Sequence, residues 1–140
     1  MRVIKFRLWD VKGKAMFAVD ELCFFDQNIS EVGTDHDHYF EEDFTEGLAV
    51  LMQFTGLKDK HGKEIYEGDV VARQSTKGNS LLVVIEYSEK GACFMGRDMA
   101  KEGIALPLFY SIPIWKKEGF EIELLGNIYE HPDLLKAPDA

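Results

Sequence analysis

Short apolar runs, most of them closed by a turn that contains glycine, are the feature that most limits the folds open to this chain. In residues 4–8, three apolar side chains alternate with two cations, which is the two-residue period of a strand with one buried face. Further extended runs are predicted at 16–19, 21–25, 48–54, 65–66, 68–71, 81–87, 92–95 and 120–125. Runs spaced this closely are typical of small barrels and sandwiches. We therefore expect an all-β fold.

Helical signals are few. Pro132 suits a first helical position and predicts a short helix over residues 132–136. Pro107 and Pro113 each lack a backbone donor, so the apolar stretch 104–115 is interpreted as an edge strand or a packed loop. The expected architecture is a small SH3-like or related barrel with additional hairpins and one or two short helices.

The length of the chain suits one domain. At 140 residues it can bury a sizeable core, and we expect a single domain over residues 1–140. Residues 26–46 break the strand pattern and are predicted to form a long exposed acidic excursion. Two alternatives stay open for this segment, which are a short helix around residues 39–46 or a segment that becomes ordered only on binding a partner.

The negative charge is concentrated in one segment. The chain has 16 Lys and Arg against 25 Asp and Glu, a net charge of -9. Residues 31–46 hold seven carboxylates and no Lys or Arg, so this segment carries -7 and the remainder -2. Such a field repels nucleic acids and anionic membranes and favours a basic protein partner. The candidate contact surface comprises Glu41, Glu42, Asp43 and Glu46.

No targeting or membrane signal is recognised. Residues 1–10 lack the apolar core of a signal peptide, and no apolar run approaches the length of a membrane span. We expect the protein to act in the cytoplasm.

Metal and thiol chemistry are weakly indicated. His36 and His38, in the sequence Asp-His-Asp-His, would point the same way on an extended segment. No third ligand stands at a fixed spacing, so a solvated acidic loop is favoured and no metal or other cofactor is expected. Cys23 and Cys93 each lie among apolar neighbours and are predicted to be buried, reduced thiols.

Residues 10–20 and 59–69 share six similar positions at the same spacing. They form either a duplicated hairpin or two turns with the same need for glycine at positive φ, at Gly13 and Gly62. The second interpretation is favoured.

Three blocks of sequence carry a family resemblance. The central block, LMQFTGLKDKHGKEIYEGDV at 51–70, closely resembles the signature of the YopX family. The blocks IKFRLWD at 4–10 and GNIYEHP at 126–132 resemble the opening and closing motifs of that family, in the same order. The resemblance implies a phage or prophage origin, a mostly β fold containing a small barrel, and no assigned biochemical activity.

Four polar residues of the central block are candidate binding residues, namely Gln53, Thr55, Asp59 and Asp69. A scaffolding role is favoured for them, because turns require such side chains. The cations of residues 58–63, with Tyr66 nearby, provide a weaker candidate for phosphate contact.

The sequence therefore predicts an accessory protein that binds a host or phage protein without catalysis. A nucleic-acid-binding barrel and a metal-dependent enzyme are the alternatives, and homo-oligomerisation stays open.

Overall fold

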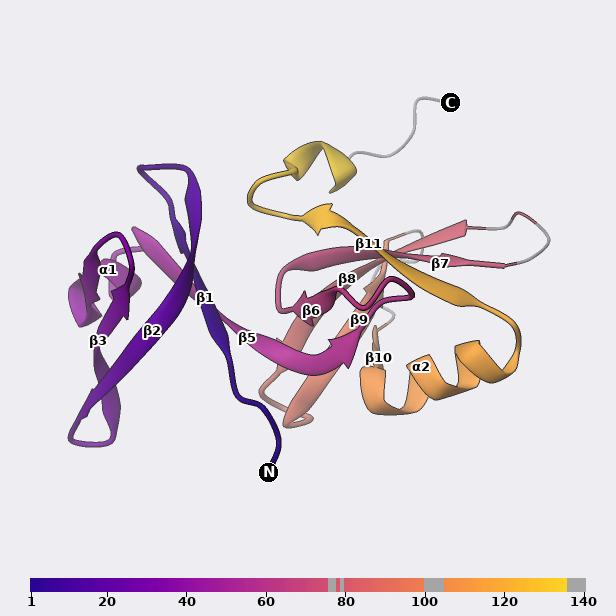
Figure 1. The fold of residues 1–140 in the computed structure, drawn as a ribbon, viewed down its shortest axis with the longest axis horizontal. Coiled ribbons are helices and arrows are strands. Elements are labelled where there is room, and N and C mark those ends of the chain that lie inside the picture. The colour runs from indigo at the N-terminus through magenta and orange to yellow at the C-terminus, as the bar shows by residue number, and fades with distance from the viewer. Residues whose placement is uncertain (76–77, 79, 100–104, 136–140) are drawn as a thin grey trace. The chain divides into compact units, whose positions relative to one another are not determined.

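The structure is a computed structural model that describes residues 1–75, 78, 80–99 and 105–135 (Figure 1). It divides into two compact units, residues 1–54 and residues 55–140, which are described separately below. Both are built mainly from antiparallel strands, so the predicted mainly-β class is confirmed. That the whole chain acts as one domain stays a prediction.

The N-terminal unit is a single antiparallel sheet with one short helix. Its strands are β1 (Phe6–Asp10), β2 (Ala15–Phe25), β3 (Asn28–Thr34), β4 (His38–Phe40) and the first part of β5 (Ala49–Lys58), and helix α1 spans Glu41–Thr45. The strand order is β4-β3-β2-β1-β5. Leu8 pairs with Phe17 on one side and Leu51 on the other, so all three side chains share one face. Leu8, fully buried, belongs to the core of this unit.

The segment 26–46 differs from the exposed excursion expected from its charge. It forms β3, β4 and α1, and the helical alternative is confirmed at Glu41–Thr45. The physical reason is cross-strand packing, because Val32 pairs with Leu22 on β2 and with Tyr39 on β4. The carboxylates occupy the other positions of this segment, so the spacing of its apolar residues is hard to recognise in the sequence.

The C-terminal unit contains a five-stranded antiparallel sheet and a second helix. After the end of β5 come β6 (Glu64–Tyr66), β7 (Asp69–Gln74), β8 (Ser80–Ser88), β9 (Cys93–Asp98) and β10 (Ala105–Pro107). Helix α2 (Leu108–Lys117), β11 (Glu121–Asn127) and a 3₁₀ helix (Pro132–Leu135) complete it. The sheet order is β10-β9-β8-β7-β11, while β6 lies beside β5. The described strands form open orders, so the expected SH3-like barrel is not confirmed.

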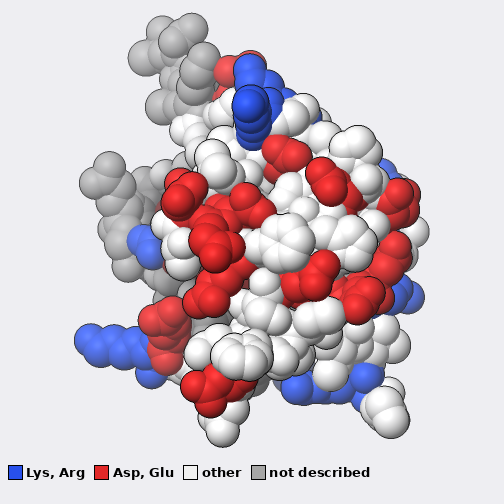
Figure 2. All heavy atoms as spheres, turned by 90° about the vertical axis from the view of Figure 1, so that its left-hand side faces the viewer, with Lys and Arg blue, Asp and Glu red and all other residues white. Residues whose placement is uncertain are grey.

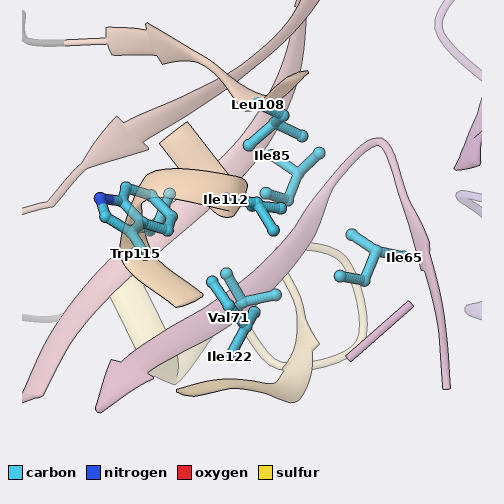
Figure 3. Close-up of a cluster of buried hydrophobic side chains, with 8 residues drawn as sticks. Ile65, Val71, Ile85, Leu108, Ile112, Trp115 and Ile122 are labelled. Atoms are coloured by element: carbon cyan, nitrogen blue, oxygen red, sulfur yellow. The ribbon is translucent and has the colours of Figure 1, made fainter. Parts of the chain in front are cut away.

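The predicted edge strand is confirmed at β10, and helix α2 corrects the interpretation of residues 108–115; Ile104 lies outside the described residues. Leu108, Ile112 and Trp115 are all buried, and their spacing of four and three residues places them on one face of a helix. Ile112 lies beside Ile85 of the sheet (Figure 3). Burial of this face outweighs the cost of Pro113 inside the helix, about 3 kcal/mol.

The loop between β5 and β6 covers the outer edge of β11 through Asp59. The Asp59 carboxylate accepts N–H bonds from His61 and Lys63 at 2.9 Å and from Leu124 of β11 at 3.0 Å. The Lys60 N–H donates to the Ile122 carbonyl at 2.9 Å. A loop that bonds in this way satisfies backbone groups that an edge strand would otherwise expose.

The same bonds set the ionisation of Asp59, which is only 7% exposed. Burial by itself would raise the pKa of the carboxyl group, but the three backbone donors outweigh burial and hold the pKa below its ordinary value. The folded state therefore favours the charged carboxylate.

We expect Asp59→Asn to lower the free energy of unfolding at pH 7 by about 2–3 kcal/mol, because charge-assisted bonds are lost and one amide donor must face a backbone N–H. Urea denaturation followed by circular dichroism measures the change. The stabilisation by Asp59 is fully present above its unfolded pKa of about 3.9 and is lost as pH falls through the lower folded pKa. The difference between the two proteins should therefore shrink below about pH 4.

Exposed Glu89 provides the control, since Glu89→Gln removes one carboxylate without a buried bond and should leave stability within about 0.5 kcal/mol. An Asp59→Asn protein as stable as the control at pH 7 would contradict this account.

Candidate functional site

The polar residues of the central block are used within the fold. Thr55 Oγ1 donates to the Ile65 carbonyl at 2.7 Å and accepts from Leu57 N–H at 3.1 Å. Asp69 is 1% exposed, and its carboxylate accepts from Tyr66 N–H at 2.7 Å. With the bonds of Asp59, these contacts support scaffolding. Gln53, half-buried on β5, pairs in register with a residue of β1.

The closing block is also structural. Asn127 is 5% exposed, and its side-chain oxygen accepts from the N–H groups of Tyr129 at 3.0 Å and Glu130 at 2.8 Å. A Cβ on Gly126 would lie 2.5 Å from His131 Nδ1, so only glycine allows the histidine ring to lie against the strand. The sequence showed this block only as a motif and not as a turn closed by its asparagine.

The turns near Gly13 and Gly62 are built differently. Gly62 has φ +79°, whereas in the first turn Lys14 takes the positive φ, 50°, and the expectation of positive φ at Gly13 is wrong. The Gly13 N–H donates to Asp10 at 2.7 Å, and a Cβ there would lie 3.2 Å from the carboxyl carbon. The tight approach of the Asp10 carboxylate favours glycine at this position.

Asp10 also links the first turn to β4, because Tyr39 Oη donates to its carboxylate at 2.8 Å. The Gly13 N–H and then the tyrosine hydroxyl lower the pKa of Asp10. Burial, and then the bond to Asp10, raise the pKa of Tyr39 far above its ordinary value. Tyr39 lies on β4, and α1 begins directly after this strand. The hydrogen bond between Tyr39 and Asp10 therefore positions the acidic segment.

The two histidines of that segment do not converge. The Thr34 hydroxyl accepts the N–H groups of His36 at 3.2 Å and Asp37 at 3.0 Å, which closes a turn. The chain is therefore not extended here, so the two-residue alternation assumed for the two histidines does not apply.

Each ring has a separate neighbour. The His36 ring stacks on Phe17 with centroids 4.7 Å apart, and His38 Nδ1 lies 2.7 Å from Glu31 Oε1. In the described part of the chain, no three His, Cys, Asp or Glu side chains gather as metal ligands.

The basic loop at 58–63 is partly neutralised. Lys60 Nζ lies 3.2 Å from Gln74 Oε1 and 3.3 Å from Glu121 Oε2. His61 Nε2 lies 3.7 Å from a Glu123 oxygen. The exposed cations of Lys58 and Lys63 therefore stand beside a carboxylate pair that weakens phosphate attraction.

Five exposed carboxylates lie within residues 35–46 of the N-terminal unit, and we call this set the acidic face: Asp35, Asp37, Glu41, Glu42 and Glu46. Asp43 has a different role, because its carboxylate accepts the Phe40 N–H at 2.8 Å and begins α1. Figure 2 shows Asp and Glu around a central group of uncharged side chains, with Lys and Arg toward the margins.

A cavity of about 260 Å³ lies in the same unit. It is lined by Ile29 of β3, Leu51 of β5, and Glu41, Phe44 and Thr45 of α1. The walls are mainly apolar, with one carboxylate among them. Sequence reasoning missed this cavity, because only the pairing of β3 and β5 with their neighbours places the strands beneath α1.

Both cysteines are partly exposed, so the prediction of buried thiols is wrong. Cys23 Sγ donates to Glu21 Oε1 at 3.1 Å, and this bond, followed by burial, raises the pKa of the thiol. A raised pKa leaves little thiolate near neutral pH, which argues against a nucleophile.

Comparison with known proteins gives a family and a fold. The family model described as "YopX protein" matches residues 5–136. The crystal structure of protein EF1440 from Enterococcus faecalis is 28% identical, covers 97% of this chain and 100% of its own, and superposes with a TM-score of 0.66. Protein yopX from Bacillus subtilis is 19% identical, covers 99% of this chain and 100% of its own, and has a TM-score of 0.62, which shows the fold alone.

No curated protein matches the chain. The described helices include none that is both long and apolar enough to pass through a membrane.

We expect Cys23 to react with a chromogenic disulfide reagent in the native protein, and Glu21→Gln to accelerate the reaction at pH 8. The reason is that the lost carboxylate no longer stabilises the protonated thiol. A Cys93→Ser background makes Cys23 the only reporter. Glu89→Gln in that background should leave the rate unchanged, and a thiol that reacts only after unfolding would contradict the structure.

Proposed function

Since the chain belongs to the YopX family, and the resemblance to that family implies no assigned biochemical activity, we propose a function from the surface of the chain itself. The protein is a non-catalytic module that binds a basic protein through the acidic face. We also propose a phage or prophage origin and action in the cytoplasm on a host or phage protein. The origin rests on the family resemblance alone.

The main support for this proposal is the exposed negative charge on short, ordered elements of the structure. Glu41, Glu42 and Glu46 are exposed on and directly after α1, and residues 31–46 contain no Lys or Arg to neutralise them. A surface of this kind attracts a basic partner at long range and sets its orientation. Because it lies on a hydrogen-bonded turn and on a capped helix with the residue that follows it, little ordering entropy is lost on binding.

The nucleic-acid alternative has less support. Lys60 and His61 already face Glu121 and Glu123, and the net charge of -9 opposes a polyanion. That alternative also relies on a small SH3-like barrel, whereas the described strands of the C-terminal sheet run in an open order.

The metal-dependent alternative would need His36 and His38 to bind the same metal ion, but their rings contact Phe17 and Glu31 respectively. We propose no catalytic residue.

We expect Glu41→Gln with Glu42→Gln to weaken partner binding about five- to tenfold, because two exposed charges that face a cationic surface are removed. Asp43 is kept, since it caps α1. Immobilised native and variant proteins are compared in bacterial lysate, and captured proteins are quantified by mass spectrometry. Capture by the native protein should fall steeply with added salt, because the Debye length is already about 8 Å at physiological ionic strength.

The matched control is Glu89→Gln with Glu118→Gln, which has the same net charge but changes exposed residues of the C-terminal unit. It should capture the same proteins as the native chain. Equal capture by all three forms would refute the acidic-face proposal. Preferential recovery of nucleic acid by the Glu41→Gln, Glu42→Gln form would favour the nucleic-acid alternative.

A further inference from the structure

We infer that the cavity beneath α1 receives one apolar side chain of the partner, and that a Lys or Arg next to this side chain pairs with Glu41. The inference rests on the proposed function. It adds the place of contact and the chemistry of the partner, which is a basic segment with an interleaved apolar residue.

The size and walls of the cavity fit such an occupant. Its volume of about 260 Å³ is below the roughly 300–1,000 Å³ of typical small-molecule sites. Ile29, Phe44 and Leu51 provide aliphatic and aromatic walls. A site of this size and polarity suits a single buried side chain, the kind of anchor that dominates protein interfaces.

The negative charge of the site determines which partner residue can lie beside the apolar side chain in the cavity. Glu41 is both a wall residue and an exposed carboxylate, and Glu42 and Glu46 lie on or next to the same short helix. An apolar anchor flanked by carboxylates would meet repulsion at the rim, whereas one flanked by Lys or Arg gains attraction. Charge complementarity therefore indicates a basic partner segment rather than a neutral or acidic one.

Exposed apolar side chains at both ends of α1 extend the contact area. Phe40, directly before the helix, is 50% exposed, and Leu48, soon after it, is 44% exposed. Aromatic and aliphatic side chains surrounded by charged groups are the usual composition of a protein-binding patch. These two residues were not part of the sequence-based candidate surface.

The helix that forms the cavity wall is held at both ends, so the cavity exists before a partner arrives. Asp43 accepts the Phe40 N–H at 2.8 Å at the start of α1. At its end, the Glu46 N–H donates to the Glu42 carbonyl at 2.9 Å and the Leu48 N–H to the Asp43 carbonyl at 2.8 Å. A preformed site avoids part of the ordering cost of binding.

The test uses three fluorescein-labelled synthetic peptides of eight residues on the full chain: alternating Lys and Leu, alternating Lys and Ser, and alternating Glu and Leu. Fluorescence anisotropy measures affinity, and methyl NMR follows Ile29 and Leu51. We expect the Lys/Leu peptide to bind and shift both methyl signals. The Lys/Ser peptide should bind at least tenfold more weakly without these shifts, and the Glu/Leu peptide should not bind.

Thr45→Trp provides the matching variant, because Thr45 is exposed and lines the cavity, so the indole would fill it. Affinity for the Lys/Leu peptide should fall at least tenfold, while affinity for the Lys/Ser peptide stays unchanged. Ala18→Trp, at an exposed position of β2 outside the cavity lining, is the control and should bind like the native protein. If Thr45→Trp fails to fold, the methyl shifts of the native protein decide the question.

The outcomes separate this inference from the proposed function. Equal binding of Lys/Leu and Lys/Ser peptides, both weakened by Glu41→Gln with Glu42→Gln, would overturn the cavity inference and leave the acidic face standing. Failure of both basic peptides to bind would count against both proposals. Methyl shifts at Ile29 and Leu51 that appear with protein concentration alone would assign the cavity to a second copy of the chain and overturn the partner inference.

Discussion

The carboxylate of Asp59 is the constraint on which the rest of the C-terminal unit depends. One side chain bonds its own loop through His61 and Lys63 and bonds β11 through Leu124. It thereby ends β5, turns the chain into β6 and closes the open edge of a five-stranded sheet. A neutral side chain of the same size cannot accept three N–H bonds, so charge is required at a position that is only 7% exposed.

The residues that maintain the fold differ from the exposed residues that we propose for binding. Four polar residues of the blocks with family resemblance form side-chain hydrogen bonds with backbone groups, namely Thr55, Asp59, Asp69 and Asn127. The acidic face and its cavity lie in residues 29–51, mostly outside those blocks. The residues that hold the scaffold and those of the proposed binding surface are therefore largely separate in the sequence.

Much of the strand pattern could be predicted, because alternation and turn residues report local structure directly. Two regions could not. Residues 108–117 form a helix, since the burial of Leu108, Ile112 and Trp115 against a sheet outweighs the local preference of proline. Residues 26–46 form strands because Val32 pairs with Leu22 on one side and with Tyr39 on the other. Leu22 lies ten residues away in the sequence, and Tyr39 is surrounded by charged residues, so neither pairing could be recognised there.

For the candidate site, the amino-acid order alone was enough to establish the net charge, its concentration in residues 31–46 and the candidate contact residues Glu41, Glu42, Asp43 and Glu46. The separate neighbours of His36 and His38 and the partial exposure of Cys23 became visible only in the folded chain. The cavity beneath α1 likewise became visible only there. The physical reason is that charge is a sum over residues, whereas the direction and burial of a side chain depend on strand register and turn geometry, which long-range pairing sets.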